Sequence, residues 1–206
     1  MTYRRHLDII DAWFASGVQA GNGAVLCRRE CSACCLGPFD ISPADAELVR
    51  NAVQQLDTDT RTSVERRAVN QLASYRELLP HWQAPWNIDE LNDAVFDELT
   101  EHFAGAPCPA LDARGSCLIY DNRPATCRMT GLPMKTPEGD QIENVCPILS
   151  TSEAFASLDA REFDLMKFED AADAHDIRAT RRGHVRTTVA GAIDPAAGRS
   201  EGISPA

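Results

Sequence analysis

The sequence lacks any hydrophobic run long enough to cross a membrane, and its basic residues are outnumbered by acidic ones. No apolar stretch approaches the ~20 residues that a transmembrane helix needs. Lys and Arg number 20 against 31 Asp and Glu, which gives a formal net charge of -11. Acidic chains are repelled by phosphate backbones and by anionic lipid headgroups. We therefore expect no nucleic acid and no membrane among its partners.

Several sequence signals of known function are also missing. The N-terminal stretch "MTYRRHLDIIDAWFASGV" has an early basic pair, but Asp8 and Asp11 interrupt the apolar segment that a signal peptide would need. We therefore expect a cytoplasmic protein. No glycine-rich loop follows a buried strand, and "GNG" at 21–23 is better explained as a helix stop. There is no internal repeat, and no pair of carboxylates at a spacing that indicates acid–base catalysis.

The hydrophobic pattern predicts a mainly α fold. Apolar residues recur at helical spacing over residues 4–18, 43–56, 60–79, 88–103 and 153–177. Ser42 and Pro43 are typical of an N-cap and a first helical position. Residues 104–149 are loop-rich, with room for one short strand or hairpin. We expect a single domain over residues 1–185, whose motif region is 25–149, followed by a disordered tail over 186–206 with too few large apolar residues to pack.

Eight cysteines contrast with these absences, and they fall in two groups far apart in the sequence. The first group is Cys27, Cys31, Cys34 and Cys35, in the pattern C-x3-C-x2-C-C. The second is Cys108, Cys117, Cys127 and Cys146. In a reducing cytosol such cysteines more often bind metal or carry redox chemistry than form disulfides. We therefore predict a helical frame around two cysteine-rich loops that converge on a metal site.

The residues around the second group suit a metal–sulfur centre. Pro109 and Pro147 each follow a cysteine, and proline holds a turn open because its φ is fixed and its backbone donor is missing. Gly115 lies two residues before Cys117 and permits close approach of the backbone to such a centre.

The spacing leaves the number and kind of metal open. Zinc and iron–sulfur clusters both accept four thiolates. Eight thiols can hold two zinc ions, one cluster with four cysteines left over, or one cluster and one zinc. The adjacent side chains of Cys34 and Cys35 diverge, so both sulfurs rarely reach one tetrahedral ion. They can serve two metals, two irons of one cluster, or one metal together with a free reactive thiol.

Arginines cluster around the cysteines of this acidic chain. Zinc or an oxidised four-iron cluster bound by four thiolates carries a net charge of about -2, and that charge is costly to bury without donors and cations. Arginine's fork of donors suits such anionic partners. The alternative is that these arginines are solvated or paired with Glu30, Asp112 and Asp121. The candidates are Arg28, Arg29, Arg114, Arg123 and Arg128.

Two stretches, "CRRECSACC" and "CPALDARGSCLIYDNRPATCR", carry a resemblance to a known family. Together with Cys146-Pro147 they resemble the YkgJ-type cysteine-cluster family, whose members are described as zinc- or iron-chelating proteins with a CxxCxxCC-type signature. The second stretch is the more specific, since it is similar to the family pattern G-x-C-x-I-Y-x-x-R-P-x-x-C-R. Here three residues, and not two, separate Cys27 from Cys31. The resemblance covers roughly residues 25–149.

The resemblance implies metal binding through these cysteines, without fixing one activity. The leading prediction is a protein that coordinates an iron–sulfur cluster or zinc through up to eight cysteines. A second is a cluster-dependent enzyme with a redox or protein-modifying role, since flagellin lysine N-methylases are relatives that combine such a cluster with protein methylation. A third is a module whose helices bind a protein partner and whose loops are tied by structural zinc. His102, near Cys108, is assigned to a helix surface and not to the metal.

Overall fold

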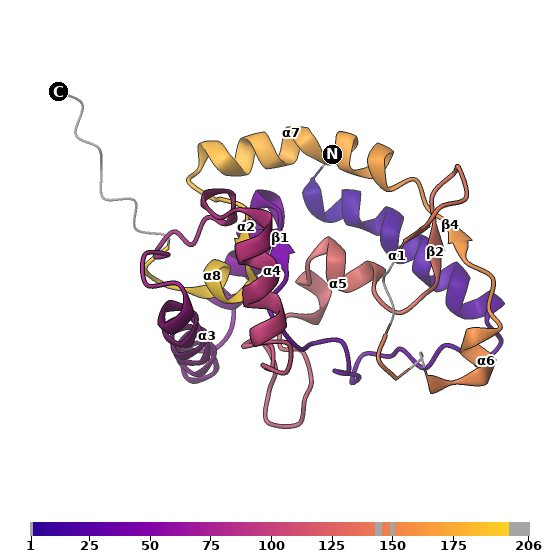
Figure 1. Ribbon diagram of the computed structural model, residues 1–206, viewed down its shortest axis with the longest axis horizontal. Coiled ribbons are helices and arrows are strands. Elements are labelled where there is room, and N and C mark those ends of the chain that lie inside the picture. Colours follow the sequence, from indigo (N-terminus) through magenta and orange to yellow (C-terminus); the bar gives the residue numbers. More distant parts are fainter. Residues whose placement is uncertain (1, 143–145, 149–150, 198–206) are drawn as a thin grey trace.

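Helices make up most of the chain, which confirms the mainly α prediction (Figure 1). The computed structural model describes residues 2–142, 146–148 and 151–197. No helix within these ranges has the length and apolar character needed to cross a bilayer. The helices are α1 (Tyr3–Ala20), α2 (Pro43–Gln54), α3 (Thr58–Leu78), α4 (Asp93–His102), α5 (Ala125–Met129), α6 (Glu153–Ala156), α7 (Leu165–Arg181) and α8 (Val189–Ile193). Short 3-10 turns cover Ile88–Glu90 and Tyr120–Asn122.

Side-chain caps fix where the helices begin. Ser42 accepts a hydrogen bond from the Asp45 amide and Pro43 is the first residue of α2, so the predicted cap is confirmed. The helix expected over 88–103 begins later. Asn87 caps only the 3-10 turn, and Asn92 accepts a hydrogen bond from the Val95 amide to start α4. Ile88 instead donates its amide to a carbonyl of the C-terminal region, which diverts the chain before the helix starts.

Short two-residue strands, five of them within the described ranges, pair with one another in two small sheets. β1 (Asp40–Ile41) pairs antiparallel with β5 (Thr187–Thr188). This pairing holds the chain that follows the first four cysteines against the C-terminal region. β2 (Met134–Lys135) forms a hairpin with β3 (Gln141–Ile142) and pairs in parallel with β4 (Arg161–Glu162). The predicted hairpin in the loop-rich region is therefore present.

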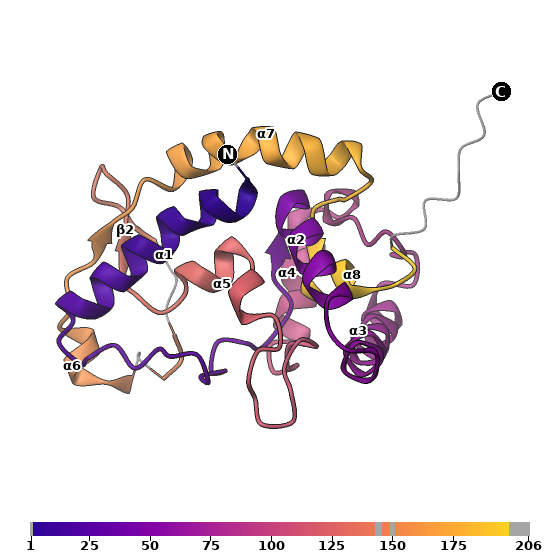
Figure 2. The same ribbon diagram turned by 180° about the vertical axis from the view of Figure 1, so that it is seen from behind.

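The core is divided into three apolar clusters that surround α5. In Figures 1 and 2, α5 lies between α1 and α7 on one side and α2, α4 and α8 on the other. The largest cluster joins α2, α3 and α8, and includes Val49, Leu72 and the buried rings of Trp82 and Trp86. A second cluster, around Leu7, joins α1, α7 and β2. The third contains Cys146. α5 is therefore packed against other elements on more than one side, which fixes the position of Cys127.

The tail predicted from residue 186 is packed as far as residue 197, which corrects that expectation. β5 and α8 are buried, and Asp194 accepts a hydrogen bond of 2.6 Å from the indole of Trp86. Small side chains are required here, because a Cβ added at Gly191 would overlap Thr187 and lie 3.0 Å from the Cβ of Trp86. Such residues carry little hydrophobic signal in the sequence. The rest of the predicted tail, 198–206, lies outside the described residues, and the single domain over 1–185 remains a prediction.

Candidate metal centre

The first cysteine segment, residues 21–39, is a loop between α1 and β1. Local turns shape it, because the amide of Cys31 donates to the carbonyl of Arg28 and the amide of Cys35 to that of Ser32, each at 2.9 Å. The segment runs back from the far end of α1 toward the middle of the molecule (Figures 1 and 2). With its backbone polar groups bonded locally, the loop can present several side chains on one face.

Backbone hydrogen bonds join this segment to the second one. The amide of Cys108 donates to the carbonyl of Cys35 at 2.9 Å, and the amide of Gly37 donates to the carbonyl of Ala106 at 2.7 Å. Leu36 and Pro107 form an isolated antiparallel bridge between these two bonds. The two segments therefore meet as a short antiparallel pair that brings Cys35 next to Cys108.

The loop from Cys108 to Cys117 folds back on itself. The carboxylate of Asp112 accepts the amides of Arg114 and Ser116, each at 2.8 Å, and Leu111 bridges to Cys117. Gly115 has a φ of +81°, and a Cβ there would lie 3.0 Å from the hydroxyl of Ser32 in the first segment. The close approach expected at Gly115 is therefore made to the other cysteine loop.

Cys127 is placed by α5, whose start is fixed by a buried acid. Asp45 is only 2% exposed, and its carboxylate accepts the amide of Ala125 at 3.1 Å and the hydroxyl of Tyr3 at 2.9 Å. Burial raises the pKa of Asp45 to about 7. In the sequence this residue resembles an ordinary first-turn acid of α2, so its role in positioning the Cys127 helix was not predicted.

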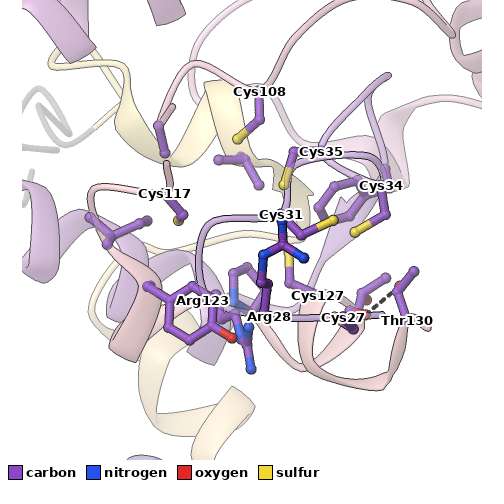
Figure 3. Close-up of a pocket in the computed structure, with 17 residues that line it drawn as sticks. Cys27, Arg28, Cys31, Cys34, Cys35, Cys108, Cys117, Arg123, Cys127 and Thr130 are labelled. Atoms are coloured by element: carbon purple, nitrogen blue, oxygen red, sulfur yellow. Dashed lines mark hydrogen bonds between the residues drawn. The ribbon is translucent and has the colours of Figure 1, made fainter. Parts of the chain in front are cut away.

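Seven of the eight predicted ligands line one pocket of about 230 Å³. Figure 3 shows them surrounding the pocket together with Arg28 and Arg123. The apolar part of the wall includes Phe39, Ile119 and Val189, the last from the C-terminal region that we had expected to be disordered. The seven are Cys27, Cys31, Cys34, Cys35, Cys108, Cys117 and Cys127.

The pocket brings the thiols together, but they are not arranged as the ligands of a single ion. All eight cysteines lie in described ranges, and all are free thiols. Within the described part of the chain, no three Cys, His, Asp or Glu side chains form a group that could hold one ion. The donor chemistry still fits, since thiolates are the preferred ligands of iron–sulfur clusters and of structural zinc. Which thiols serve as ligands remains a prediction.

Cys146 does not line the pocket. Its side chain is 6% exposed and belongs to the apolar cluster that includes Val25, Leu132 and Phe155. Cys27 packs against the same cluster, so the two thiols lie near each other at this end of the site. A negative charge on Cys146 would raise the pKa of Cys27. Cys146 therefore lies in this apolar cluster and outside the lining of the pocket.

Burial raises the pKa of several pocket thiols, whereas the pKa of Cys34 is lowered. The hydrogen bond from the Cys35 thiol is the largest influence on Cys34 and lowers the pKa of Cys34 to about 7. The same bond raises the pKa of Cys35. Desolvation raises the pKa of Cys27 to about 11 and that of Cys108 to about 12, and it also raises the pKa of Cys127. Binding a metal here must therefore release protons.

Two of the five arginines near the cysteines hold the scaffold together. Arg29 forms an ion pair of 2.6 Å with Asp121 and lies over the ring of Tyr120, with 4.7 Å between its guanidinium carbon and the ring centroid. Arg128 is 2% exposed and donates to Asp11 of α1 and to the carbonyls of residues 121 and 123. Both were candidates for compensating a metal–thiolate charge, and both contact aspartates instead.

The remaining three arginines differ in their relation to the pocket. Arg114 is exposed on the loop near Asp112, outside the pocket lining. Arg28 and Arg123 line the pocket. His102 ends α4 on the surface, outside the pocket lining, as expected.

The fold and pocket are those of a mainly α, cysteine-rich protein in which seven of the eight cysteines line one pocket. A family model, CxxCxxCC, described as "Putative zinc- or iron-chelating domain", matches residues 26–147. This is more than half of the chain, so the chain belongs to this family, as the resemblance of its two cysteine stretches indicated. Searches of curated proteins and of solved structures gave no match.

Proposed function

We propose that the pocket binds zinc or an iron–sulfur cluster through thiolates from both cysteine segments, and that holding this metal is the function of the chain. One observation carries the proposal: seven cysteines from segments far apart in the sequence line a single cavity. The cavity is also large for one ion, since a water molecule occupies about 30 Å³ in the liquid. Seven thiols and this volume favour a centre with more than one metal atom.

Four of the thiols form the inner set of this proposal. Desolvation, and after it negative charge on Cys108, Cys117 and Cys34, raises the pKa of Cys127; desolvation, and after it charge on Cys117 and Cys34, raises that of Cys108. Two of the four come from the Cys108–Cys117 loop, one from α5 and one from the first segment. Cys27 lies toward the end of the site where Cys146 is buried. We therefore expect Cys34, Cys108, Cys117 and Cys127 to matter most for metal binding.

Anaerobic purification, followed by metal analysis and visible absorption spectroscopy, tests the proposal. A brown protein with iron and acid-labile sulfide identifies a cluster. A colourless protein with zinc identifies a thiolate zinc site, and two zinc ions per chain would favour the structural role of a protein-binding module. Protein that is folded but takes up neither metal after anaerobic reconstitution with iron and sulfide, or with zinc, would contradict the proposal.

Single substitutions separate the inner set from the rest. Cys34→Ser and Cys127→Ser should each lose most of the bound metal, because a neutral hydroxyl is a poor substitute for a thiolate. Cys146→Ala is the matched control, since it removes a thiol that does not line the pocket. It should retain metal at a stoichiometry close to that of the wild type. Equal losses in all three variants would overturn the assignment of the inner set.

A second candidate function, thiol chemistry on a substrate, is supported by the surplus of thiols. Seven cysteines exceed the four that one zinc ion or one cluster needs. In the adjacent pair, Cys34 has a pKa near 7, at which a thiolate is available at neutral pH. Alkylation of the metal-loaded protein tests this candidate. One cysteine that is modified while metal stays bound supports it, and protection of every cysteine opposes it.

A further inference from the structure

Arg28 and Arg123 line the pocket, and neither has an acidic partner among the described residues. Within the described ranges, neither side chain forms an ion pair or a hydrogen bond. This is unexpected in a chain where acidic residues outnumber basic ones by 31 to 20. Nearby, Arg29 and Arg128 are both paired with aspartates. The pocket therefore keeps two positive charges facing its thiols.

Arg123 is the more firmly placed of the two. Its guanidinium carbon lies 3.9 Å from the centroid of the Tyr120 ring, which favours a cation through the negative face of its π system. Arg29 lies on the same ring at 4.7 Å, but the charge of Arg29 is already offset by Asp121. The carbonyl of Arg123 accepts a hydrogen bond of 2.9 Å from buried Arg128, which fixes the backbone. Arg28, by contrast, is exposed.

One donor of Arg123 is left without a partner. Its Nε atom is buried and forms no hydrogen bond within the described part of the chain. A buried N–H of a charged group that lacks an acceptor is destabilising, so such donors normally have a partner in the functional state. The pocket that Arg123 lines is walled mainly by cysteine and apolar side chains, with Tyr120, Thr126 and Thr130 as its hydroxyl-bearing residues. Metal-bound thiolates would be the strongest acceptors available there.

We infer that Arg123 is a positioning residue of the metal centre: stacked on Tyr120, its guanidinium compensates the negative charge of the metal–thiolate group and donates a hydrogen bond to it. The inference rests on the proposed metal-binding function. A centre of zinc or four irons with four thiolates carries a net charge of about -2, which a partly apolar pocket stabilises poorly without a cation. Arg123 lines the same pocket as thiols of both cysteine segments, among them Cys34 and Cys117.

The test compares Arg123→Gln, Arg123→Lys and the control Arg114→Gln. Each variant is loaded with the metal that the wild-type protein holds on purification. For zinc, the measurement is apparent affinity in competition with a chelator, with cobalt(II) as a spectroscopic probe of thiolate coordination. Arg123→Gln should weaken affinity by about tenfold or more, as is typical when a residue that supports metal ligands is lost. Arg123→Lys should recover part of this loss, and Arg114→Gln should match the wild type.

For an iron–sulfur cluster, the measurement is the midpoint potential. Removing a cation and an N–H donor destabilises the reduced, more negative cluster, so Arg123→Gln should lower the potential. A tenfold change in the reduction equilibrium corresponds to about 59 mV for one electron. A merely structural role of Arg123 would not produce this shift together with partial rescue by lysine.

Substitutions at Tyr120 provide a second, independent test. Tyr120→Phe keeps the ring and should behave as the wild type, whereas Tyr120→Leu removes the stacking surface and should move affinity or potential in the direction of Arg123→Gln. Circular dichroism verifies that each variant is folded. Unchanged affinity and potential in Arg123→Gln, or equal changes in Arg114→Gln, would overturn the inference while leaving metal binding intact. A wild-type protein that binds no metal would instead refute the proposed function itself.

Discussion

The backbone amide of Cys108 lies 2.9 Å from the backbone carbonyl oxygen of Cys35, so the two cysteine segments are joined through their main chains. A second bond, from Gly37 to Ala106, lies beside it. Neither bond depends on a thiol or on a metal. The two cysteine segments are therefore held together by the same kind of main-chain pairing that forms a β-sheet, and the proposed metal would bind to a site whose position this pairing already sets.

Metal removal should leave the helices in place while loosening the site. The three apolar clusters and the Cys35–Cys108 pairing do not require metal, so far-UV circular dichroism should change little after chelation. The unfolding midpoint should fall, because a ligand present at 100 times its Kd contributes about 2.7 kcal/mol to stability.

Hydrogen exchange tests the same prediction at single amides. In metal-free protein, the amides of Gly37 and Cys108 should stay protected, because both are bonded across the two segments. Loss of most of the helical signal on chelation, or rapid exchange at both amides, would show that the metal itself joins the segments.

Arg128→Met should destabilise the protein strongly even though this arginine does not line the metal pocket. The buried guanidinium binds Asp11 of α1 and two carbonyls of the turn before α5. Removing it leaves the two carbonyls without this donor and leaves Asp11 with Arg4 as its partner, and breaking such a buried pair typically costs about 3–5 kcal/mol. Since the side chain of Asp11 is 34% exposed, we expect the lower end of that range. Urea denaturation measures the change.

Arg114→Met is the matched control for this prediction. Arg114 is exposed and lies outside the pocket lining, so its removal should change the free energy of unfolding by less than about 0.5 kcal/mol. If Arg128→Met were as mild as Arg114→Met, the hydrogen bonds of Arg128 would not be what holds α5 against α1.

Asp45 should make the stability of the fold decrease as the pH rises through the weakly acidic range. Burial raises its pKa from 3.8 to about 7. Between these values the native state binds more protons than the unfolded state, so the free energy of unfolding falls with increasing pH. The contribution is complete below about pH 4 and is lost by about pH 7. Asp45→Asn cannot ionise and should lack this dependence.

Denaturation of metal-free protein at several pH values between 4 and 7 measures this effect. The difference in unfolding free energy between Asp45→Asn and the wild type should move in favour of the variant as the pH rises. Gln54→Ala, an exposed change in α2 between two side chains that do not ionise, should show a pH-independent difference over the same range. A constant difference for Asp45→Asn as well would mean that this carboxyl titrates normally.

The sequence predicted the elements whose signals are local. Ser42 and Pro43 mark the start of α2 because a cap and a first-turn proline act within a few residues. The two cysteine groups were likewise visible in the sequence, whereas their convergence on a metal site stays a prediction. The pairing of Cys35 with Cys108 was not visible, since main-chain contacts between distant loops leave no pattern in either loop.

Contacts between residues far apart in the sequence also determine which charged residues are buried and how the C-terminal region packs. Asp45 and Arg128 occupy positions where acids and bases are common on helix surfaces, yet both are buried against other elements. Val189 lines the pocket, but it lies in a stretch whose small residues suggested disorder. Burial of small side chains depends on how closely their neighbours approach, and single-sequence hydrophobicity does not report that distance.

Gly191→Ala tests whether the C-terminal region is packed as closely as the structure indicates. Alanine favours a helix over glycine by about 1 kcal/mol, so in a loose tail the change would be neutral or stabilising. Here the added Cβ would overlap Thr187 and lie 3.0 Å from the Cβ of Trp86, and overpacking of this kind costs about 1–3 kcal/mol. We expect net destabilisation of about 1 kcal/mol, measured by thermal or urea denaturation. Gly105→Ala is the control, because a Cβ there meets nothing within 4 Å and should change stability little. A stabilised Gly191→Ala variant would mean that α8 does not dock against Trp86, and that Val189 does not form part of the pocket wall.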